Sequence, residues 1–409
     1  MLKVLQFIFL GFTFLIFYSY FIYPFLLKIC VVLFGKKPLF NKDYVPSVAV
    51  LVPVYNEEKV VEKKIRNILA LDYPAHKLSV WIGSDQSTDQ TNSIVSNYPD
   101  TRVHLWIAEK RGGKTEVLNH LTPQINSEII LFTDANTMHN PDCLKQMVGY
   151  FYDSTVGIVA GRVIHIVNNN VAEDKPLNIR VNKNVTEDKP LNIRVQKGEA
   201  FAEEMYRSFE VWQKKHESEL HSSISAFGGF YSIRKNLFKP IPFNAYSNDD
   251  VLIPMNVIRQ KKRVIFEEKA ISKEDVSGNL KMEFSRRIRI GAGNFQAFFW
   301  LLDFLNPFRG WPAFCFLSHK VIRWFSPLFL LGSCLSLLAL YILTLNSVYF
   351  YILFIALLFV LLSVMHLFIP IKLVRSLFYF FAMNVALLFG FFRYLGGIKS
   401  ATWSRTERE

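Results

Sequence analysis

The sequence has few charged residues and few cysteines for its length. Only 20% of the 409 residues are charged, whereas 51% are apolar and 15% are aromatic. A disordered chain has the opposite composition, so this class of protein is excluded. The cysteines are Cys30, Cys143, Cys315 and Cys334, and their spacing fits neither a metal site nor a disulfide framework. We interpret them as small buried hydrophobes, which is compatible with a reducing compartment.

Acidic residues are outnumbered by basic residues, 34 to 47, which gives a formal net charge of +13. The basic residues are spread along the chain and no nucleic-acid-binding motif accompanies them, so we expect no nucleic-acid partner. In a protein with membrane segments, an excess of Lys and Arg indicates contact with anionic lipid and control of topology. We therefore expect the lipid bilayer to be one partner.

Charge is absent from long stretches near both ends of the chain. Residues 4–27 hold no charged side chain, which is enough to cross a bilayer, and no small-residue cleavage site of a signal peptide follows. Lys36, Lys37 and Lys42 come after this run and only Lys3 precedes it. This asymmetry predicts that the middle of the chain lies in the cytoplasm. The further predicted spans are residues 326–345, 348–369 and 377–392.

These segments divide the chain into four predicted parts of a multi-pass cell-membrane protein. The parts are an N-terminal transmembrane helix (1–34), a cytoplasmic domain (35–294), an interfacial amphipathic segment (295–325) and a C-terminal region with three spans (326–409). The third part is rich in aromatic residues but is interrupted by prolines and charges, so we place it in the headgroup region. Four spans put both termini outside, whereas basic residues after the last span favour the inside. The last segment is alternatively re-entrant.

Strands and helices alternate through the predicted cytoplasmic domain. The predicted strands are residues 48–54, 78–83, 103–108 and 129–133, and the predicted helices are residues 60–71, 114–121, 142–152 and 251–259. Apolar strands that alternate with helices predict an α/β fold with a mostly parallel sheet. Ligands of such sheets bind at the carboxyl ends of the strands, where the polar clusters 55–57, 85–89 and 134–136 fall. We therefore expect these clusters to share one pocket.

One segment of the predicted domain is duplicated. Residues 171–184 and 185–198 match at 11 of 14 positions, and both contain EDKPLNIRV. Two short copies are too few for a solenoid. We interpret them as a tandem duplication in a surface loop, with a flap that contacts an acceptor as the alternative.

The run KRGGKT at residues 110–115 resembles a phosphate-binding loop but is incomplete. The full signature requires a glycine where Ala108 stands, which argues against a phosphate-loop NTPase. The Gly-Gly-Lys turn can still present backbone N–H groups and the Lys114 ammonium to a diphosphate. A solvated basic loop is the alternative.

Several acidic and basic residues have both a structural and a chemical interpretation. Asp134 and Asp85 follow predicted strands, where an aspartate either forms a turn or contacts a ligand or its cation. Asp249 and Asp250 precede a helical pattern, so they either favour the helix dipole or supply a general base. Residues 286–289 place three guanidinium groups together, where they neutralise either a leaving diphosphate or lipid phosphates.

Taken in this order, these pieces resemble the membrane-embedded family 2 glycosyltransferases, which include cellulose, chitin and hyaluronan synthases. The resemblance covers about residues 45–325. The matching pieces are VPVYNEE (52–58), SDQSTDQT (84–91), KRGGKTEVLN (110–119), FTDANT (132–137), GGFYSIR (228–234), NDD (248–250) and RRIRIGAGNFQ (286–296). The resemblance implies a GT-A fold, a nucleotide-sugar donor that is usually a UDP-sugar, and Mg²⁺ or Mn²⁺ as cofactor.

The resemblance also implies roles in donor binding. Tyr55 and Glu57 are expected to border the base, and Asp85 is expected to contact the uridine. Lys114 is expected to approach the nucleotide. Asp134 matches the first carboxylate of the metal-binding D-x-D motif.

Other positions match the family pattern with substitutions. Asn136 replaces the second aspartate of the metal-binding motif. Asp250 matches the catalytic base, with Asp249 in place of the more usual glutamate. Arg286 and Arg289 match the Gln and Arg of the family's Q-x-x-R-W motif, so Arg286 departs from that pattern.

The tryptophan of the Q-x-x-R-W motif is replaced by Ile290. That tryptophan belongs to the acceptor-binding signature of the processive synthases, so its absence weakens the prediction of a long polymer. We expect an inverting, metal-dependent enzyme that moves a sugar from a nucleotide sugar to a glycan or lipid-linked acceptor, in polysaccharide or glycoconjugate synthesis. Synthase or export subunits are expected partners. The alternative function is a non-catalytic nucleotide-sugar-binding subunit of a synthase.

Overall fold

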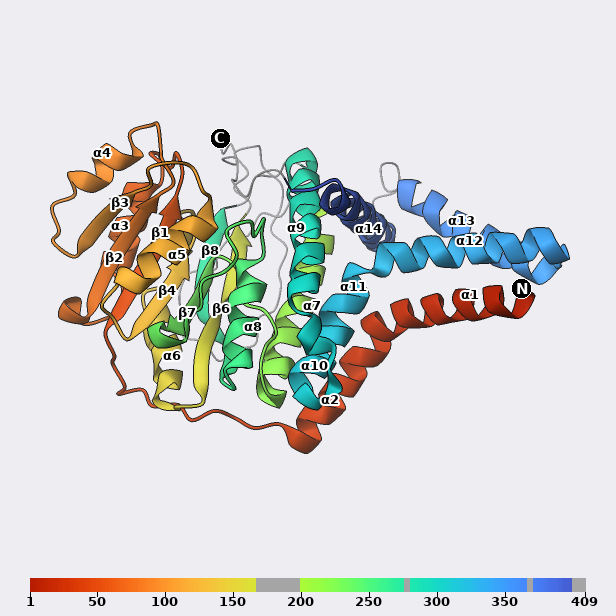
Figure 1. The fold of residues 1–409 in the computed structure, drawn as a ribbon, viewed down its shortest axis with the longest axis horizontal. Coiled ribbons are helices and arrows are strands. Elements are labelled where there is room, and N and C mark those ends of the chain that lie inside the picture. The colour runs from red at the N-terminus through yellow and green to blue at the C-terminus, as the bar shows by residue number, and fades with distance from the viewer. Residues whose placement is uncertain (167–198, 276–279, 366–370, 399–409) are drawn as a thin grey trace.

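The computed structural model describes residues 1–166, 199–275, 280–365 and 371–398. An α/β domain forms one end of the molecule and a group of apolar helices forms the other (Figure 1). The duplication at residues 171–198 lies outside the described residues.

An eight-stranded sheet forms the centre of the α/β domain, in the order β3-β2-β1-β4-β7-β6-β8-β5. The strands are β1 (Val48–Val54), β2 (Leu78–Ser84), β3 (Val103–Ile107), β4 (Ile129–Thr133), β5 (Thr137–His139), β6 (Val156–Ile166), β7 (Phe230–Arg234) and β8 (Arg263–Asp275). Parallel pairing joins β3, β2, β1 and β4, and also β6 and β8. β7 runs antiparallel between β4 and β6, and β5 runs antiparallel to β8. The predicted α/β class and mostly parallel sheet are confirmed.

Helices cover both faces of this sheet, which explains why its central strands are apolar throughout. All seven residues of β1 are buried, and residues 48–52 alternate between two hydrophobic clusters. Ala49 and Leu51 pack with α5 (Lys114–Gln124) and α8 (Asp249–Arg259), whereas Val50 and Val52 pack with the helices of the other face. Those helices are α3 (Val61–Leu69), α4 (Thr91–Ser96) and α6 (Cys143–Val148), which η3 (Gly149–Tyr152) continues.

Two long helices that the sequence analysis did not assign lie between the sheet and the apolar helices (Figure 1). They are α7 (Glu199–Leu220) and α9 (Leu280–Trp300). α9 runs without a break across residue 294, where the sequence analysis set a domain boundary. After it come short helices, namely η5 (Leu302–Leu305), η6 (Pro307–Arg309), α10 (Trp311–Cys315), η7 (Phe316–Val321) and α11 (Ile322–Trp324).

Four helical segments of the described residues are long and apolar enough to cross a membrane. The first, Leu2–Phe34, consists of α1 (Leu2–Phe17), the π-helical turn η1 (Tyr18–Ile22) and α2 (Tyr23–Phe34). The others are α12 (Ser326–Thr344), α13 (Ser347–Val364) and the part Leu373–Leu395 of α14 (Lys372–Leu395). α14 continues past Arg375 and Arg393, which bracket the shorter predicted span.

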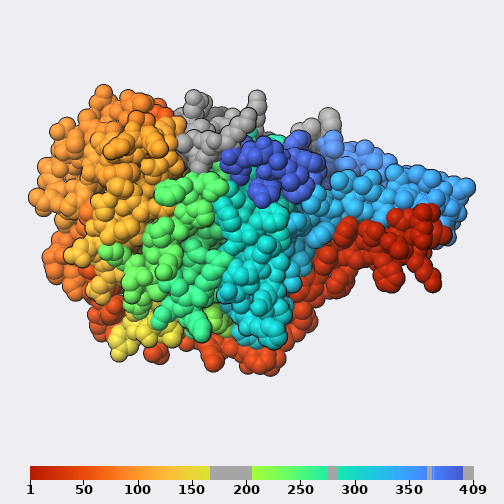
Figure 2. Space-filling model, viewed as in Figure 1, coloured from red at the N-terminus to blue at the C-terminus, as the bar shows by residue number. Residues whose placement is uncertain are grey.

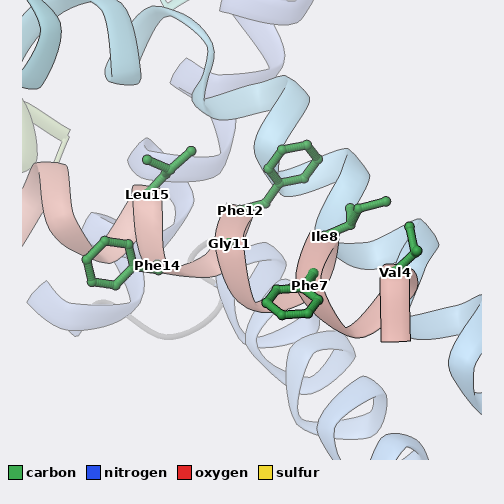
Figure 3. A pocket seen from close by; sticks show the side chains of 7 residues that line it. All are labelled: Val4, Phe7, Ile8, Gly11, Phe12, Phe14 and Leu15. Carbon is green, nitrogen blue, oxygen red and sulfur yellow. The ribbon is translucent and has the colours of Figure 1, made fainter. Parts of the chain in front are cut away.

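The apolar helices expose much of their hydrophobic surface. They project from the α/β domain as an arm in the space-filling view (Figure 2). α1 carries a shallow apolar hollow (Figure 3), lined by Val4, Phe7, Ile8, Gly11, Phe12, Phe14 and Leu15. Apolar surface of this extent is unfavourable in water and suits contact with lipid.

Close contact between α9 and α14 depends on two glycines. A Cβ built at Gly390 would lie 2.8 Å from the backbone of Gly291 and of Ala292. Such a distance is too short for non-bonded atoms, so a side chain at this position would force the two helices apart.

We expect Gly390→Ala to destabilise the protein by about 1–3 kcal/mol, the usual effect of overpacking a tight contact. Gly11→Ala is the matched control, because no atom lies within 4 Å of a Cβ built at Gly11. Thermal unfolding in detergent would measure both variants. An unchanged midpoint for Gly390→Ala would contradict the close approach of the two helices.

Candidate active site

The first group of site residues lies where β1 and β2 end. Arg111, from the loop before α5, places its guanidinium carbon 3.6 Å from the centroid of the Tyr55 ring. Its Nε lies 3.6 Å from Oδ2 of Asp85. Asp85 is fully buried, and its Oδ1 accepts hydrogen bonds from the N–H groups of Gly112 (2.8 Å) and Gly113 (3.0 Å). Gly113 has a φ of +84°, which a glycine adopts without strain.

The two carboxylate oxygens of Asp85 therefore differ in their hydrogen bonds. Oδ1 is committed to two backbone donors, whereas no hydrogen bond from the described residues reaches Oδ2. Oδ2 faces the guanidinium that lies on the Tyr55 ring. A flat group that stacked on Tyr55 in place of this guanidinium would find one acceptor atom, Oδ2, for an N–H of its own.

The loops after β1 and β2 are joined by hydrogen bonds into one unit. The N–H of Glu57 donates to Oγ1 of Thr91 (2.8 Å), and the N–H of Asn56 donates to Oγ of Ser87 (3.0 Å). Asn56 adopts a left-handed φ of +54°, which its short polar side chain tolerates. Glu57 thus lies at this edge of the sheet, beside the loop that follows Asp85.

Lys114 connects the end of β4 to the start of α8. Its ammonium lies 3.0 Å from Oδ1 of Asp134 and 3.1 Å from Oδ2 of Asp249, and it donates to the carbonyl oxygen of Gly228 (2.9 Å). Burial disfavours the charged ammonium, but the two carboxylates outweigh this and hold the pKa of Lys114 above its ordinary value. Lys114 is therefore a fixed positive charge between two acidic residues.

The acidic pair at the start of α8 consists of two carboxylates in unlike surroundings. Asp249 accepts a hydrogen bond from the Tyr231 hydroxyl (3.3 Å) in addition to its ion pair with Lys114. Burial and the neighbouring charge of Asp249 raise the pKa of Asp250 to about 6, although Lys214, Lys114 and Lys320 act in the opposite direction. Asp250 is thus the member of the pair that can exchange a proton near neutral pH.

The turn before the acidic pair is held by α9. Asn248 has a left-handed φ of +71°, and its side-chain amide donates to Oδ1 of Asn294 (2.7 Å). The N–H of Tyr246 donates to Oε1 of Gln296 (2.9 Å). α9 therefore fixes the point at which Asp249 and Asp250 enter the site.

Asn136 uses its amide nitrogen in a contact that the sequence analysis did not foresee. Its Nδ2 donates to Oε1 of Glu274 (3.0 Å), and Oε2 of Glu274 lies 3.3 Å from Nε2 of His165. Burial would raise the pKa of Glu274, but His165, the charge of Arg286 and the Asn136 amide together lower it. Glu274 is therefore an ionised partner, and Asn136 retains only its amide oxygen for a ligand.

Asp134 fits a divalent cation that is shared with phosphate. Its side chain is 40% exposed, so the carboxylate is accessible even while Oδ1 contacts Lys114. In the described residues no three His, Cys, Asp or Glu side chains gather into a complete metal site. Mg²⁺ is commonly bound by one or two carboxylates together with substrate phosphate oxygens, and Asp134 with the Asn136 oxygen suits this mode.

Arg289 extends the site toward the membrane helices. Burial lowers the pKa of Arg289, and so do the charges of Arg286 and Arg393, whereas Tyr246 and Asp134 raise it. The Arg393 guanidinium, from α14, lies 5.0 Å from the centroid of the Tyr246 ring. Arg289 is therefore within electrostatic reach of Asp134.

The loop of residues 111–114 unites the predicted site residues. Its first part contacts Tyr55 and Asp85, and its last residue contacts Asp134 and Asp249. The sequence analysis did not single out Arg111, Tyr231, His165, Glu274 or Lys214. For Arg111 and Tyr231 a signal was present in KRGGKT and GGFYSIR, whereas the others lie outside the quoted motifs.

Comparisons with known proteins identify similar sequences and a similar fold. Residues 49–236 match the protein-family model described as Glycosyl transferase family 2. A beta-monoglucosyldiacylglycerol synthase from Synechocystis sp. is 35% identical over 121 residues, which is 29% of this chain and 25% of that protein. A poly-beta-1,6-N-acetyl-D-glucosamine synthase from Staphylococcus aureus is 28% identical over 129 residues, which is 31% of each protein. The matches thus span about a quarter to a third of the length of these relatives.

A solved structure shares the fold over nearly the whole chain. The mannosyltransferase PcManGT from Pyrobaculum calidifontis, in complex with GDP-Man and Mn²⁺, has a TM-score of 0.69 and 21% sequence identity. The similarity covers 96% of this chain and 99% of that chain. Residues 49–236 therefore match a family 2 glycosyltransferase domain, and the chain has the GT-A fold, joined to four helices that are able to span a membrane.

Proposed function

We propose that the protein is an inverting glycosyltransferase that moves a sugar from a UDP-sugar to a hydroxyl group of a glycan or lipid-linked acceptor. The observation that carries this proposal is the loop of residues 111–114, which contacts Asp85 at one end and Asp134 and Asp249 at the other. A nucleotide sugar presents a base, a diphosphate and a sugar in the same order. Each of these groups meets side chains of suitable chemistry along the loop.

The base-binding end favours uracil over guanine. Only Oδ2 of Asp85 lacks a hydrogen bond, so the carboxylate offers one acceptor atom to a ring that stacks on Tyr55. Uracil has one ring N–H between two carbonyl groups, which matches a single acceptor. Guanine presents two adjacent N–H donors and would need both oxygens of the carboxylate. This supports a UDP-sugar, although the similar mannosyltransferase was solved with GDP-Man.

The diphosphate would lie near Asp134 and Arg289. Asp134 and the amide oxygen of Asn136 would hold Mg²⁺ or Mn²⁺, which offsets the negative charge of the diphosphate when bound. Arg289 is within electrostatic reach of Asp134 and would stabilise charge that develops on the leaving UDP. The charge of Arg286 stabilises the Glu274 carboxylate, which accepts a hydrogen bond from Asn136. We therefore assign Arg286 a supporting role for the turn at Asn136.

Asp250 is proposed as the general base. Asp249 is engaged by Lys114 and Tyr231, which leaves Asp250 to accept the proton of the acceptor hydroxyl. The acceptor oxygen bonds to the anomeric carbon while the bond from that carbon to the diphosphate oxygen breaks. A single displacement of this kind inverts the anomeric centre. Orientation of the two substrates supplies much of the acceleration.

The helices that could span a membrane support a membrane-linked acceptor and a location in the cell membrane. The excess of Lys after the first span supports a catalytic domain on the cytoplasmic side of the cell membrane. The relatives act in glycolipid and polysaccharide synthesis, as their names state, and Ile290 favours a short product. We also propose the four-part domain organisation predicted from the sequence, and synthase or export subunits as partners.

A non-catalytic nucleotide-sugar-binding subunit is the second candidate. Asn136 favours it, because the turn offers a cation only one carboxylate, and the Asn136 amide nitrogen is already bound to Glu274. Nucleotide binding without turnover across a panel of donor sugars would support this candidate over the enzyme.

We expect Asp250→Asn to lower kcat by about 10²–10⁴-fold, the usual effect of removing a positioned base. UDP affinity should be unchanged, because Asp250 is not expected to contact the nucleotide. Sugar transfer and UDP binding would be measured in parallel. Asp43→Asn, an exposed acid between the first span and β1, serves as the control. Full activity in Asp250→Asn would refute the assigned base.

The raised pKa of Asp250 predicts an acidic limit to activity. The base must be deprotonated, so kcat/KM should fall as the pH drops below about 6, by tenfold per pH unit at the lower end. An unperturbed aspartate would place this limit near pH 4. A pH profile of kcat/KM for the wild-type enzyme would check this expectation, and a profile that stayed flat down to pH 4.5 would contradict it.

UDP should bind at least tenfold more tightly than GDP, because the wrong base leaves a buried polar atom unpaired. Calorimetric titration of both nucleotides into the full chain would measure the difference. Equal or tighter binding of GDP would show that Asp85 does not select the base as proposed.

A further inference from the structure

α7 carries a row of buried polar side chains on one face. Glu210, Gln213, Lys214 and Glu217 are 8%, 0%, 3% and 0% exposed, respectively. Residues three, four and seven positions apart share a face of a helix. Charged side chains on a buried face require partners, since an isolated buried charge is strongly unfavourable. The residues that contact these four side chains show which parts of the molecule α7 connects.

The two glutamates contact the segments that lead into the membrane helices. Glu217 accepts a hydrogen bond from the Tyr23 hydroxyl of α2 (2.8 Å) and lies 2.6 Å from Nδ1 of His319 in η7. Glu210 forms an ion pair with Arg323 of α11 (2.8 Å), and it lies 3.0 Å from Nε2 of His319. These contacts fix α7 to the first span and to the segment that precedes α12.

Lys214 has its contacts on the side of the catalytic site. Its ammonium donates to the carbonyl oxygens of Ser225 and Ala226 (each 3.1 Å) and also to the Ser225 hydroxyl. The N–H of Ala226 in turn donates to the main-chain oxygen of Asp250 (2.8 Å). Two residues later, the carbonyl oxygen of Gly228 accepts a hydrogen bond from Lys114.

We propose that Lys214 is a positioning residue, which holds residues 225–229 in the conformation that places Asp250 and Lys114. It acts through these two groups and contacts no substrate. Glu210 and Glu217, on the same face of α7, contact the membrane-proximal segments, so this face links the membrane arrangement to the proposed base. The kinetic consequence rests on the proposed function, whereas the structural consequence does not.

The charge of Lys214 also acts on Asp250. Burial and the nearby Lys320 lower the pKa of Lys214 to about 8, against the opposing charges of Glu210, Asp250 and Glu217. The other charged groups that face Asp250 are Asp249, Lys114 and Lys320. The loss of the Lys214 charge removes one stabiliser of the Asp250 carboxylate. The acidic limit of the kcat/KM profile should therefore move to higher pH.

The test compares Lys214→Met with Lys215→Met in the full chain. Lys215 is the neighbouring residue, and its ammonium lies 2.6 Å from a carboxylate oxygen of Glu268, away from residues 225–229. In Lys214→Met we expect amide hydrogen exchange in residues 225–230 to become at least tenfold faster, because the segment loses its charged anchor. Lys215→Met should leave the exchange rate unchanged.

Kinetic measurements on the same variants distinguish a positioning role of Lys214 from a general loss of stability. Lys214→Met should lower kcat by about tenfold and leave the donor KM within twofold, because donor binding does not depend on Asp250 and Lys114 keeps its ion pairs with Asp134 and Asp249. Lys214→Arg keeps the charge and donors, so it should recover most of the loss. In the Asp250→Asn background, Lys214→Met should add little further loss, since both changes act on the same group.

The outcomes that overturn the proposal are distinct from those that overturn the proposed function. Unchanged exchange in residues 225–230 of Lys214→Met refutes the positioning role, whatever the activity. If Lys214→Met does not fold, Ser225→Ala removes one acceptor of the same ammonium, and unchanged exchange and kcat in that variant refute the role as well. If the wild-type protein transfers no sugar from any donor, the proposed function fails while the exchange data still decide the role of Lys214.

Discussion

The ammonium of Lys114 lies between carboxylates of Asp134 and Asp249, which belong to distant parts of the chain. Without this charge, the two carboxylates would repel one another in a partly buried pocket. The same lysine begins α5, and the two residues before it bind Asp85 through backbone N–H groups. One short loop therefore fixes the distance between the base-binding end and the acidic end of the site, on which the proposed chemistry depends.

The second constraint is the junction between the catalytic domain and the membrane helices. In the described residues, this junction includes ion pairs of Glu210 in α7 with Lys320 and Arg323 in the segment before α12, as well as apolar packing. Buried ion pairs contribute little net stability, but the removal of one partner leaves a buried charge uncompensated. Such contacts strongly favour one arrangement of the partners. The proposed function would require that fixed arrangement, since the proposed base would have to meet a hydroxyl group presented at a membrane.

Much of the fold was predictable because its signals are local. β1 and β4 have the predicted bounds, since each is a continuous apolar run between polar residues. The apolar runs likewise located the four candidate spans. α7 and α9 were not predicted, and the reason is physical. α7 buries Glu210, Lys214 and Glu217, so its buried face lacks the apolar periodicity that indicates a helix. α9 contains three arginines and two glycines in its central part, which weaken the helical pattern.

The order of motifs in the sequence determined the fold class and the candidate acids Asp85, Asp134 and Asp250, because chain order sets which loops follow which strands. Tertiary structure alone decided how the charges pair. It placed Lys114 between two acids, Glu274 against Asn136 and Lys214 behind the loop next to Asp250. Lys114 and Asp249, like Asn136 and Glu274, come from segments far apart in the sequence, and Lys214 lies on a different helix from Asp250. Whether a buried charge is neutralised, or its pKa displaced, depends on distances that exist only after the chain has folded.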